Sequence, residues 1–363
     1  MTMPYRADQV GSLLRPSQLI DARTAYAEGR LDLDALHAVE DEAILDILEQ
    51  QRQAGIDVFT DGEYRRYNFY SDMVDAVSGF VAAPERTTSW QGEGGGQLAG
   101  RAIGGKLEQN RRLTEHELPF LRAHAPGPIK VTVPSASQFV RFYKDGLTDQ
   151  FYPTRAHLAR DLAAIVHREL EWLIAEGVPY IQIDAPNYTG LVDAAGRDRL
   201  RQSGVDPDDV LDEAIRVDNA SVAGLARDGV TIALHLCRGN SRSRWLSEGS
   251  YEPIAEKLFN GLDVGRLLLE YDSERAGGFE PLRFMPAGKE VVLGLITTKE
   301  GHLEGEDDLL RRIDEASAYV ARENLAISPQ CGFASAMLGN LLSMDDQRRK
   351  LELVGDVARK AWG

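Results

Sequence analysis

The sequence predicts an α/β fold in which eight parallel strands close into a (β/α)8 TIM barrel with helices around it. Three observations predict this: short apolar runs alternate with longer segments of helical period, the runs number eight, and 363 residues suit a barrel with insertions. The expected strands are Asp8–Leu13, Ile56–Thr60, Ile129–Pro134, Tyr180–Asp184, Val230–Cys237, Gly265–Glu270, Glu290–Ile296 and Ala326–Ser328.

The segments between these runs carry apolar residues three and four positions apart, the pattern of a helix with one buried face. Examples are Leu36, Val39, Ala43 and Ile47, and later Leu158, Leu162, Ile165 and Leu173. Several of these segments end at a glycine or proline before the next strand, as at Ala54-Gly55 and Gly177-Val178-Pro179. The pattern therefore indicates an outer ring of helices.

The interval Val77–Lys106 follows the second expected strand and breaks this rhythm with a polar, glycine-rich stretch. We expect an excursion from the barrel here, a hairpin or a lid. A phosphate-binding loop is not indicated, because no strand directly precedes the glycines and no glycine motif leads into a helix. The glycines of this interval are Gly92, Gly94, Gly95, Gly96, Gly100, Gly104 and Gly105.

No linker or repeat divides the chain, so residues 1–363 are expected to form a single domain.

The charge of the chain argues against nucleic-acid and membrane partners. The formal net charge of −16 repels a phosphate backbone or an anionic lipid surface. No stretch approaches the roughly 18 uninterrupted apolar residues of a membrane span. The expectation is a cytoplasmic protein, whose oligomeric state the sequence does not indicate. The two cysteines, Cys237 and Cys331, provide no disulfide framework.

The most informative motif lies in the fifth expected strand. Alternate residues of a strand share a face, so Ala233, His235 and Cys237 lie on one face while the leucines between them lie on the other. An imidazole and a thiol two positions apart project in parallel and can bind one metal ion. A His-x-Cys pair also occurs by chance among buried core residues, so this motif alone does not decide the point.

A second thiol follows the eighth expected strand, in Pro329-Gln330-Cys331-Gly332. Barrel enzymes place reactive groups at the carboxyl ends of strands, where Cys331 would meet His235 and Cys237. Two sulfurs and one nitrogen are typical ligands of Zn²⁺, and a catalytic site leaves a fourth position open. Glu270, at the end of the sixth strand, is either a fourth ligand that substrate displaces or a partner of the histidine outside the ligand set.

Two carboxylates and a hydroxyl complete the expected site. Glu63 follows the second strand, and Asp184 ends the fourth with its side chain on the face opposite Ile181 and Ile183. Both are placed to bind a cationic group such as an ammonium. Ser12 ends the first strand, where accessible backbone N–H groups suit a carboxylate. Helix capping, a rim salt bridge or an ordinary turn would account for these residues equally well.

Taken in order, the motifs resemble those of the cobalamin-independent methionine synthase family. They are Val10-Gly11-Ser12, Asp61-Gly62-Glu63, Ile181-Gln182-Ile183-Asp184, His235-Leu236-Cys237 and Pro329-Gln330-Cys331-Gly332. The resemblance covers nearly all of the chain. It is to the short, single-barrel members, which correspond to the catalytic half of the full-length synthase and include epoxyalkane:coenzyme M transferase. It implies zinc held by His235, Cys237 and Cys331 with Glu270 as a further ligand, and homocysteine contacts at Ser12, Glu63 and Asp184.

The activity expected from these residues is zinc-dependent alkyl transfer to a thiol, with homocysteine as acceptor and methionine as product. The donor stays open among a methylfolate, a methylated corrinoid protein, another methyl carrier and an epoxide opened by the thiolate. The chain begins at the catalytic half, so the amino-terminal barrel that helps the full-length synthase hold folate is not expected here. It also lacks an aromatic residue in Thr132–Ser137, where the resemblance places a pterin-stacking tryptophan.

Three alternatives stand beside this expectation. An epoxide-opening transferase would use coenzyme M or another thiol and need an acid, for which Tyr188 and His302 are the candidates. A zinc hydrolase or lyase would activate water in the open position. A binding protein or a metal-free decarboxylase relative would leave the ligands incidental.

Overall fold

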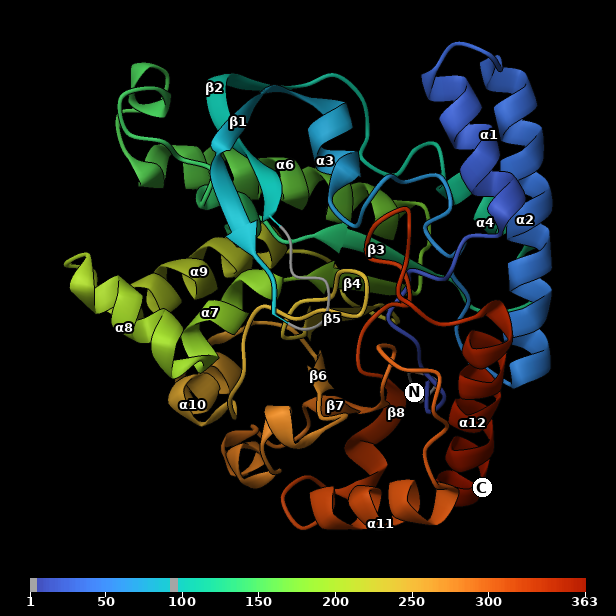
Figure 1. Ribbon diagram of the computed structural model, residues 1–363. Coiled ribbons are helices and arrows are strands. Elements are labelled where there is room, and N and C mark those ends of the chain that lie inside the picture. The colour runs from blue at the N-terminus through green and yellow to red at the C-terminus, as the bar shows by residue number, and fades with distance from the viewer. Residues whose placement is uncertain (1–4, 92–96) are drawn as a thin grey trace.

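Six parallel strands form one sheet in chain order in the computed structural model, which describes residues 5–91 and 97–363 (Figure 1). They are β3 (Lys130–Pro134), β4 (Tyr180–Asp184), β5 (Thr231–Leu236), β6 (Arg266–Glu270), β7 (Glu290–Ile296) and β8 (Leu325–Pro329). Asp184 pairs in register with Pro134 on one side and with His235 on the other. The carboxyl ends of these neighbouring strands therefore lie side by side.

Six of the eight expected strands are thus confirmed, and the first two form only single bridges within the described chain. Ala7 bridges Ile327 of β8, and Phe59 bridges Ile129, both in parallel. Backbone hydrogen bonds of 2.8 to 2.9 Å run from Asp8 N to Ile327 O, from Asp57 N to Ala7 O and from Lys130 N to Phe59 O. These bonds connect β8, residues 6–8, residues 57–59 and β3 in that order.

Side-chain hydrogen bonds explain why the first of these segments is not a regular strand. The Asp57 carboxylate accepts from the backbone N–H groups of Arg6 and Ala7 at 2.7 and 2.9 Å. The Asp8 carboxylate accepts from the N–H of Gln9 at 2.8 Å. Amides held by carboxylates are not available to a strand ladder, so the pairing is reduced to isolated bonds. Gly11 then turns the chain at φ +140°, a conformation that side chains rarely adopt.

Helices surround the strands in Figure 1. The longest, α2, begins at an Asp32 cap that accepts from Ala35 N, ends at Gly55 in the left-handed conformation, and buries an apolar stripe that includes Leu36 and Ile47. None of the described helices combines the length and apolarity needed to cross a membrane. The helices are α1 (Ser17–Ala27), α2 (Leu33–Ala54), α3 (Ser71–Ala76), α4 (Leu118–His124), α5 (Ser137–Val140), α6 (Arg155–Ala175), α7 (Thr189–Val192), α8 (Ala194–Gln202), α9 (Pro207–Val222), α10 (Glu252–Gly261), α11 (Glu306–Ala316) and α12 (Met344–Trp362), with 3-10 turns at Thr148–Gln150, Pro186–Tyr188, Glu274–Ala276, Glu280–Phe284 and Arg322–Asn324.

The glycine-rich interval forms an antiparallel hairpin of β1 (Val77–Ser89) and β2 (Gln97–Gln109), separate from the parallel sheet. Gly92 and Gly94 to Gly96, which the sequence singles out, lie outside the described residues. Just beyond β1, Gln91 pairs with Trp245, which lies in the loop after β5. The backbone N–H of Gln91 donates to Trp245 O at 2.8 Å. The hairpin is therefore attached to the loop that follows His235 and Cys237.

The two faces of the parallel sheet bury different kinds of side chain. One face, including Val131, Ile183 and Leu234, packs into the large apolar core beneath the helices. The other carries a buried ion network near the strand starts, where Lys130 Nζ lies 2.6 Å from Asp8 Oδ1. Tyr180 OH donates to the second Asp8 oxygen at 2.8 Å. Each buried charge is therefore paired, as burial requires.

Candidate metal centre

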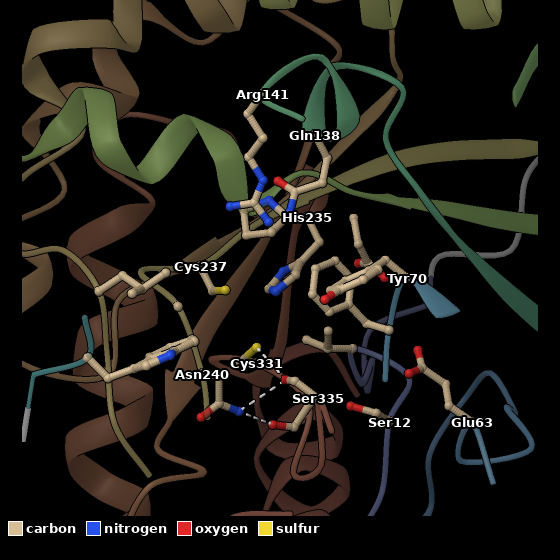
Figure 2. Close-up of a pocket in the computed structure, with 18 of the residues that line it drawn as sticks. Ser12, Glu63, Tyr70, Gln138, Arg141, His235, Cys237, Asn240, Cys331 and Ser335 are labelled. Atoms are coloured by element: carbon tan, nitrogen blue, oxygen red, sulfur yellow. Dashed lines mark hydrogen bonds between the residues drawn. The ribbon is translucent and has the colours of Figure 1, made fainter. Parts of the chain in front are cut away.

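Three potential metal ligands meet at the carboxyl ends of β5 and β8. Each residue offers one ligand atom: an imidazole nitrogen from His235 and the sulfurs of Cys237 and Cys331. These three atoms all lie within 4.8 Å of one another. All three side chains are buried, and Figure 2 shows them converging from separate segments. Alternation along β5 directs His235 and Cys237 to the same face, and the turn after Pro329 brings Cys331 to meet them.

His235 carries the clearest sign that this group is built for a ligand. Both of its ring nitrogens are buried, and neither has a hydrogen-bond partner in the described chain. An unpaired buried polar group costs about 1–3 kcal/mol, so native structures rarely leave one without a reason. The Cys331 sulfur makes a long contact of 3.9 Å with Ser335 Oγ and interacts with the Cys237 thiol. A nitrogen and two sulfurs with so few partners fit the donor set of Zn²⁺.

The two thiols differ in acidity. Interaction with the Cys331 thiol holds the pKa of Cys237 well below its ordinary value, and His235 lowers that pKa further. Interaction with Cys237 and burial raise the pKa of Cys331 well above its ordinary value. Without a metal, Cys237 is therefore the thiol that ionises first. A thiolate is the form of cysteine that binds metals.

Glu270 lies outside the three-residue group. Its Oε2 accepts from the backbone N–H of Arg238 at 2.6 Å, and its Oε1 accepts from Arg275 Nη2 at 3.1 Å. Both carboxylate oxygens are therefore engaged by the protein. Arg238 directly follows Cys237, so Glu270 fixes the backbone next to that cysteine. The two roles expected of Glu270, a fourth ligand that substrate displaces and a partner outside the ligand set, both stay predictions.

A cavity of about 260 Å³ opens beside the three residues. Ser12, Glu63 and Asp184 all line it together with His235, Cys237 and Cys331, so the structure brings six of the seven predicted site residues around one space. Gly332 also lines it, and a Cβ at that position would lie 1.9 Å from Ser12 Oγ. Glycine is thus required for the chain after Cys331 to approach Ser12.

The two carboxylates on the cavity are incompletely paired. The backbone of Glu63 has a positive φ of 58°. Its Oε1 accepts from Thr132 Oγ1 at 2.8 Å, whereas its buried Oε2 has no hydrogen-bond partner in the described chain. Asp184 accepts from Gln182 Nε2 at 2.8 Å. Burial raises the pKa of Asp184 to about 7, with His235 opposing the rise and Glu63 adding to it. Arg66 Nη1 lies 3.7 Å from Glu63 Oε1, which leaves Glu63 Oε2 and the Asp184 carboxylate to face the cavity, where they suit a positively charged ligand group.

Several lining residues were not predicted from the sequence. Trp90 and Arg101 come from the hairpin, Tyr70 from the segment before α3, and Gln138 and Arg141 from α5 and the position after it. The sequence lacks an aromatic residue directly after β3, but the cavity obtains rings from elsewhere. Their types offered a signal, since aromatic residues and arginine are enriched at binding sites, but their distance along the chain concealed it.

A second group of potential ligands, Asp72, His116 and Glu117, has a different explanation. The Arg66 guanidinium lies between the acids, with Nε 2.7 Å from Asp72 Oδ2 and Nη2 2.6 Å from Glu117 Oε2. Burial lowers the pKa of His116 to about 4, so the imidazole is neutral. The cation that this group holds is Arg66.

The two candidate acids for epoxide opening lie away from the site. Tyr188 OH donates to Asp218 Oδ2 at 2.8 Å, and burial raises its pKa well above the ordinary value. Neither Tyr188 nor His302 is among the residues that line the cavity. The structure therefore supplies no acid at the positions considered.

Comparison with known proteins identifies the family and agrees with an α/β fold built on a parallel sheet. A family model described as the catalytic domain of cobalamin-independent synthases matches residues 6–359, and the chain belongs to this family. It is a methionine synthase-like catalytic domain in a family of methyltransferase enzymes.

Relatives match over nearly their whole length. The chain is 35% identical over 366 residues to "Uncharacterized protein YxjG" of Bacillus subtilis (strain 168), covering 99% of this chain and 95% of that protein. It is 26% identical over 325 residues to "Methionine synthase" of Pyrococcus abyssi, covering 89% and 84%. The crystal structure of a putative vitamin-B12 independent methionine synthase from Listeria monocytogenes matches with a TM-score of 0.74 and 26% identity, over 100% of this chain and 99% of that one.

Proposed function

We propose that this protein is a zinc-dependent S-methyltransferase that methylates the thiol of homocysteine and forms methionine. The observation that carries the proposal is the group of His235, Cys237 and Cys331, whose ligand atoms lie within 4.8 Å at a cavity that two acids share. The methionine synthases among the relatives support the choice of acceptor.

In this proposal His235, Cys237 and Cys331 hold Zn²⁺. When bound, the metal favours the thiolate form of a thiol at its open position, which is the nucleophilic form. The imidazole can act as a ligand because neither nitrogen is engaged by the protein. Glu270 acts from outside the ligand set, because its hydrogen bond to Arg238 N holds the backbone that carries Cys237.

Ser12, Glu63 and Asp184 are assigned to the amino-acid end of homocysteine. The unpaired Glu63 Oε2 and the Asp184 carboxylate provide acceptors for the α-ammonium. The approach of Gly332 to Ser12 places backbone and hydroxyl groups beside them for the α-carboxylate. Bound in this way, the acceptor is fixed at one end while its sulfur points toward Cys237 and Cys331. The thiol gives its proton to solvent, and the sulfur attacks the donor's methyl carbon, while the donor leaves with the electron pair of the bond that breaks.

We further infer that the fold is a closed (β/α)8 barrel formed by one domain, with the hairpin as its excursion. The argument is the continuous path of hydrogen bonds from β8 through residues 6–8 and 57–59 to β3. A sheet without free edges satisfies backbone groups that open edges would leave exposed.

Metal analysis tests the proposal first. Protein reconstituted with zinc under reducing conditions is expected to hold about one equivalent, and less than about half an equivalent would count against it. Cys331→Ser and His235→Gln should each weaken zinc retention against a chelator at least tenfold, because removing a ligand loses one bond of the site. His124→Gln, on the exposed end of α4, is the matched control.

Product analysis tests the reaction. Mass spectrometry of mixtures with homocysteine and each trial donor is expected to show methionine only with the zinc-loaded protein. Turnover of a substrate without any added thiol would instead support a hydrolase. Alkylation of coenzyme M in preference to homocysteine would support the epoxide-opening transferase.

A further inference from the structure

Two buried side chains lie directly behind the two acids of the cavity. They are Thr132 of β3 and Gln182 of β4, which pair in register and are 3% and 0% exposed. Thr132 Oγ1 donates to Glu63 Oε1 at 2.8 Å. Gln182 Nε2 donates to Asp184 Oδ1, also at 2.8 Å. Neither side chain is among the described residues that line the cavity, so each of them reaches a ligand only through its acid.

A buried arginine determines which way the Thr132 hydroxyl points. Arg66 Nη1 donates to Thr132 Oγ1 at 2.9 Å, and Arg66 Nη2 donates to the backbone oxygen of Thr132 at 2.9 Å. A guanidinium offers no acceptor, so the Thr132 oxygen accepts from it and the single hydroxyl hydrogen is left for Glu63. This bond holds Glu63 Oε1 and leaves the unpaired Oε2 for a ligand.

A buried lysine determines the orientation of the Gln182 amide in the same way. Lys130 is 1% exposed, and its Nζ donates to Gln182 Oε1 at 2.9 Å. An ammonium offers no acceptor either, so the amide presents its oxygen to Lys130 and its NH₂ group to the other side. That NH₂ group donates to Val10 O at 2.6 Å and to Asp184 Oδ1. Rotating the amide by half a turn would leave Lys130 facing a second donor.

The two cations have acid partners of their own. Arg66 Nη1 lies 3.7 Å from Glu63 Oε1, beyond hydrogen-bond distance, and the Thr132 hydroxyl bonds to both. A direct ion pair would compete with the ammonium of a ligand, whereas a neutral hydroxyl or amide orients an acid and leaves its charge in place. The closest partners are Asp72 and Glu117 for Arg66, at 2.7 and 2.6 Å, and Asp8 for Lys130, at 2.6 Å.

We propose that Thr132 and Gln182 are positioning residues, each of which holds one oxygen of a cavity acid so that the other oxygen faces the ammonium of the substrate. Thr132 acts through Glu63, and Gln182 acts through Asp184. One ammonium carries three hydrogens and can donate to both acids at once. The inference rests on the proposed function, because it takes an amino acid as the thiol substrate. It extends that function to two residues that do not touch the substrate.

Calorimetry with L-homocysteine and the zinc-loaded protein tests both residues without a methyl donor. Gln182→Met and Thr132→Val remove the two donors and keep a similar side-chain size. Each should raise the homocysteine Kd at least about tenfold, as expected for the loss of one hydrogen bond to a charged group. Each variant should still hold about one equivalent of zinc. A Kd within about threefold of the wild-type value in both variants overturns the proposal.

Gln51→Met is the matched control. Gln51 is also 0% exposed and donates from Nε2 to the backbone oxygens of Ile47 and Thr60, at 3.1 and 2.9 Å, but it does not line the cavity in the described chain. Its replacement should lower the urea midpoint and leave the homocysteine Kd within about threefold of the wild-type value. A tenfold rise in this variant would show that any buried loss of hydrogen bonds weakens binding, and it would overturn the proposal.

Double variants assign the effect to the acids. In the Asp184→Asn protein, Gln182→Met should change the homocysteine Kd by less than about threefold, because no charge is left to orient. Thr132→Val should have equally little effect in the Glu63→Gln protein. A tenfold rise that persists in these backgrounds would show a general structural role and overturn the assignment. The two pairs are independent, so one variant that fails to fold leaves the other pair to decide.

The outcomes separate this inference from the proposed function. A wild-type protein that binds homocysteine and forms no methionine with any donor refutes the proposed function. An unchanged Kd in both variants of an enzyme that does form methionine refutes the positioning role alone. A wild-type protein that does not bind homocysteine refutes both.

Discussion

Replacing Asp184 with asparagine should stabilise the zinc-free protein in a pH-dependent manner while weakening homocysteine binding. Burial raises the pKa of Asp184 from the ordinary 3.8 to about 7. The unfolded chain loses this proton near pH 4, whereas the folded chain keeps it until about pH 7. The wild-type free energy of unfolding therefore falls as the pH rises from 4 to 7 and is flat above. The full loss is on the order of 4 kcal/mol.

Asparagine does not ionise, and its Oδ1 can still accept from Gln182 Nε2 as Asp184 Oδ1 does at 2.8 Å. The free energy of unfolding of Asp184→Asn, relative to that of the wild type, should therefore rise by about 3 kcal/mol between pH 5 and pH 8. Urea unfolding at both pH values, with chelator and reductant present, measures it. The exposed Asp228→Asn serves as the control for general charge effects.

A stability difference that is the same at pH 5 and pH 8 would refute this reasoning. It would mean that Asp184 is solvated or paired with a cation in the folded protein. The effect of Asp184→Asn on homocysteine binding is measured separately with zinc-loaded enzyme at pH 8. The KM for homocysteine should rise about tenfold or more, because the ammonium loses a charged partner; an unchanged KM would remove Asp184 from the acceptor site.

Three further predictions concern other parts of the site. Gly332→Ala should lower the free energy of unfolding by about 1–3 kcal/mol and raise the homocysteine KM, because its Cβ would lie 1.9 Å from Ser12 Oγ; an unchanged urea midpoint would contradict this. Arg66→Met should cost about 3–5 kcal/mol in urea unfolding, since it leaves two buried carboxylates without their cation; a loss below about 1 kcal/mol would show that they are neutral. Glu270→Gln should keep one equivalent of zinc by elemental analysis, because both carboxylate oxygens already bind protein groups; loss of the metal would make Glu270 a ligand.

Strand alternation was sufficient to predict the part of the site carried by β4 and β5. It places Asp184, His235 and Cys237 on one face, and the structure finds all three on the cavity. Cys331 was predictable for a related reason, because parallel strands end at a common edge. Local pattern determined these positions, so distant contacts were not needed to find them.

The first two strands and part of the cavity lining could not be predicted in this way. The ladder at residues 6–8 is interrupted by the Asp57 carboxylate, about fifty positions away, and no local pattern reveals that contact. Trp90 reaches the cavity because its neighbour Gln91 pairs with Trp245. Arg141 and Gln138 follow a strand in a helix too short to show a period. Each of these features depends on contacts between segments far apart in the chain.

The hydrogen bonds between residues near the two ends of the chain have a consequence for its biosynthesis. Arg6 bonds to Leu325, 319 positions later, and Asp8 N–H bonds to Ile327 O. A ribosome at about 5–20 residues per second needs tens of seconds to make that length. During that time residues 6–8 lack their partner strand, and the distant contacts of the Asp8 carboxylate are those with Lys130, Tyr180 and Arg266, once these residues have folded. Completion of the sheet must therefore wait until β8 has left the exit tunnel, and a nascent chain that stalls before it would expose the edges of β7 and of residues 6–8.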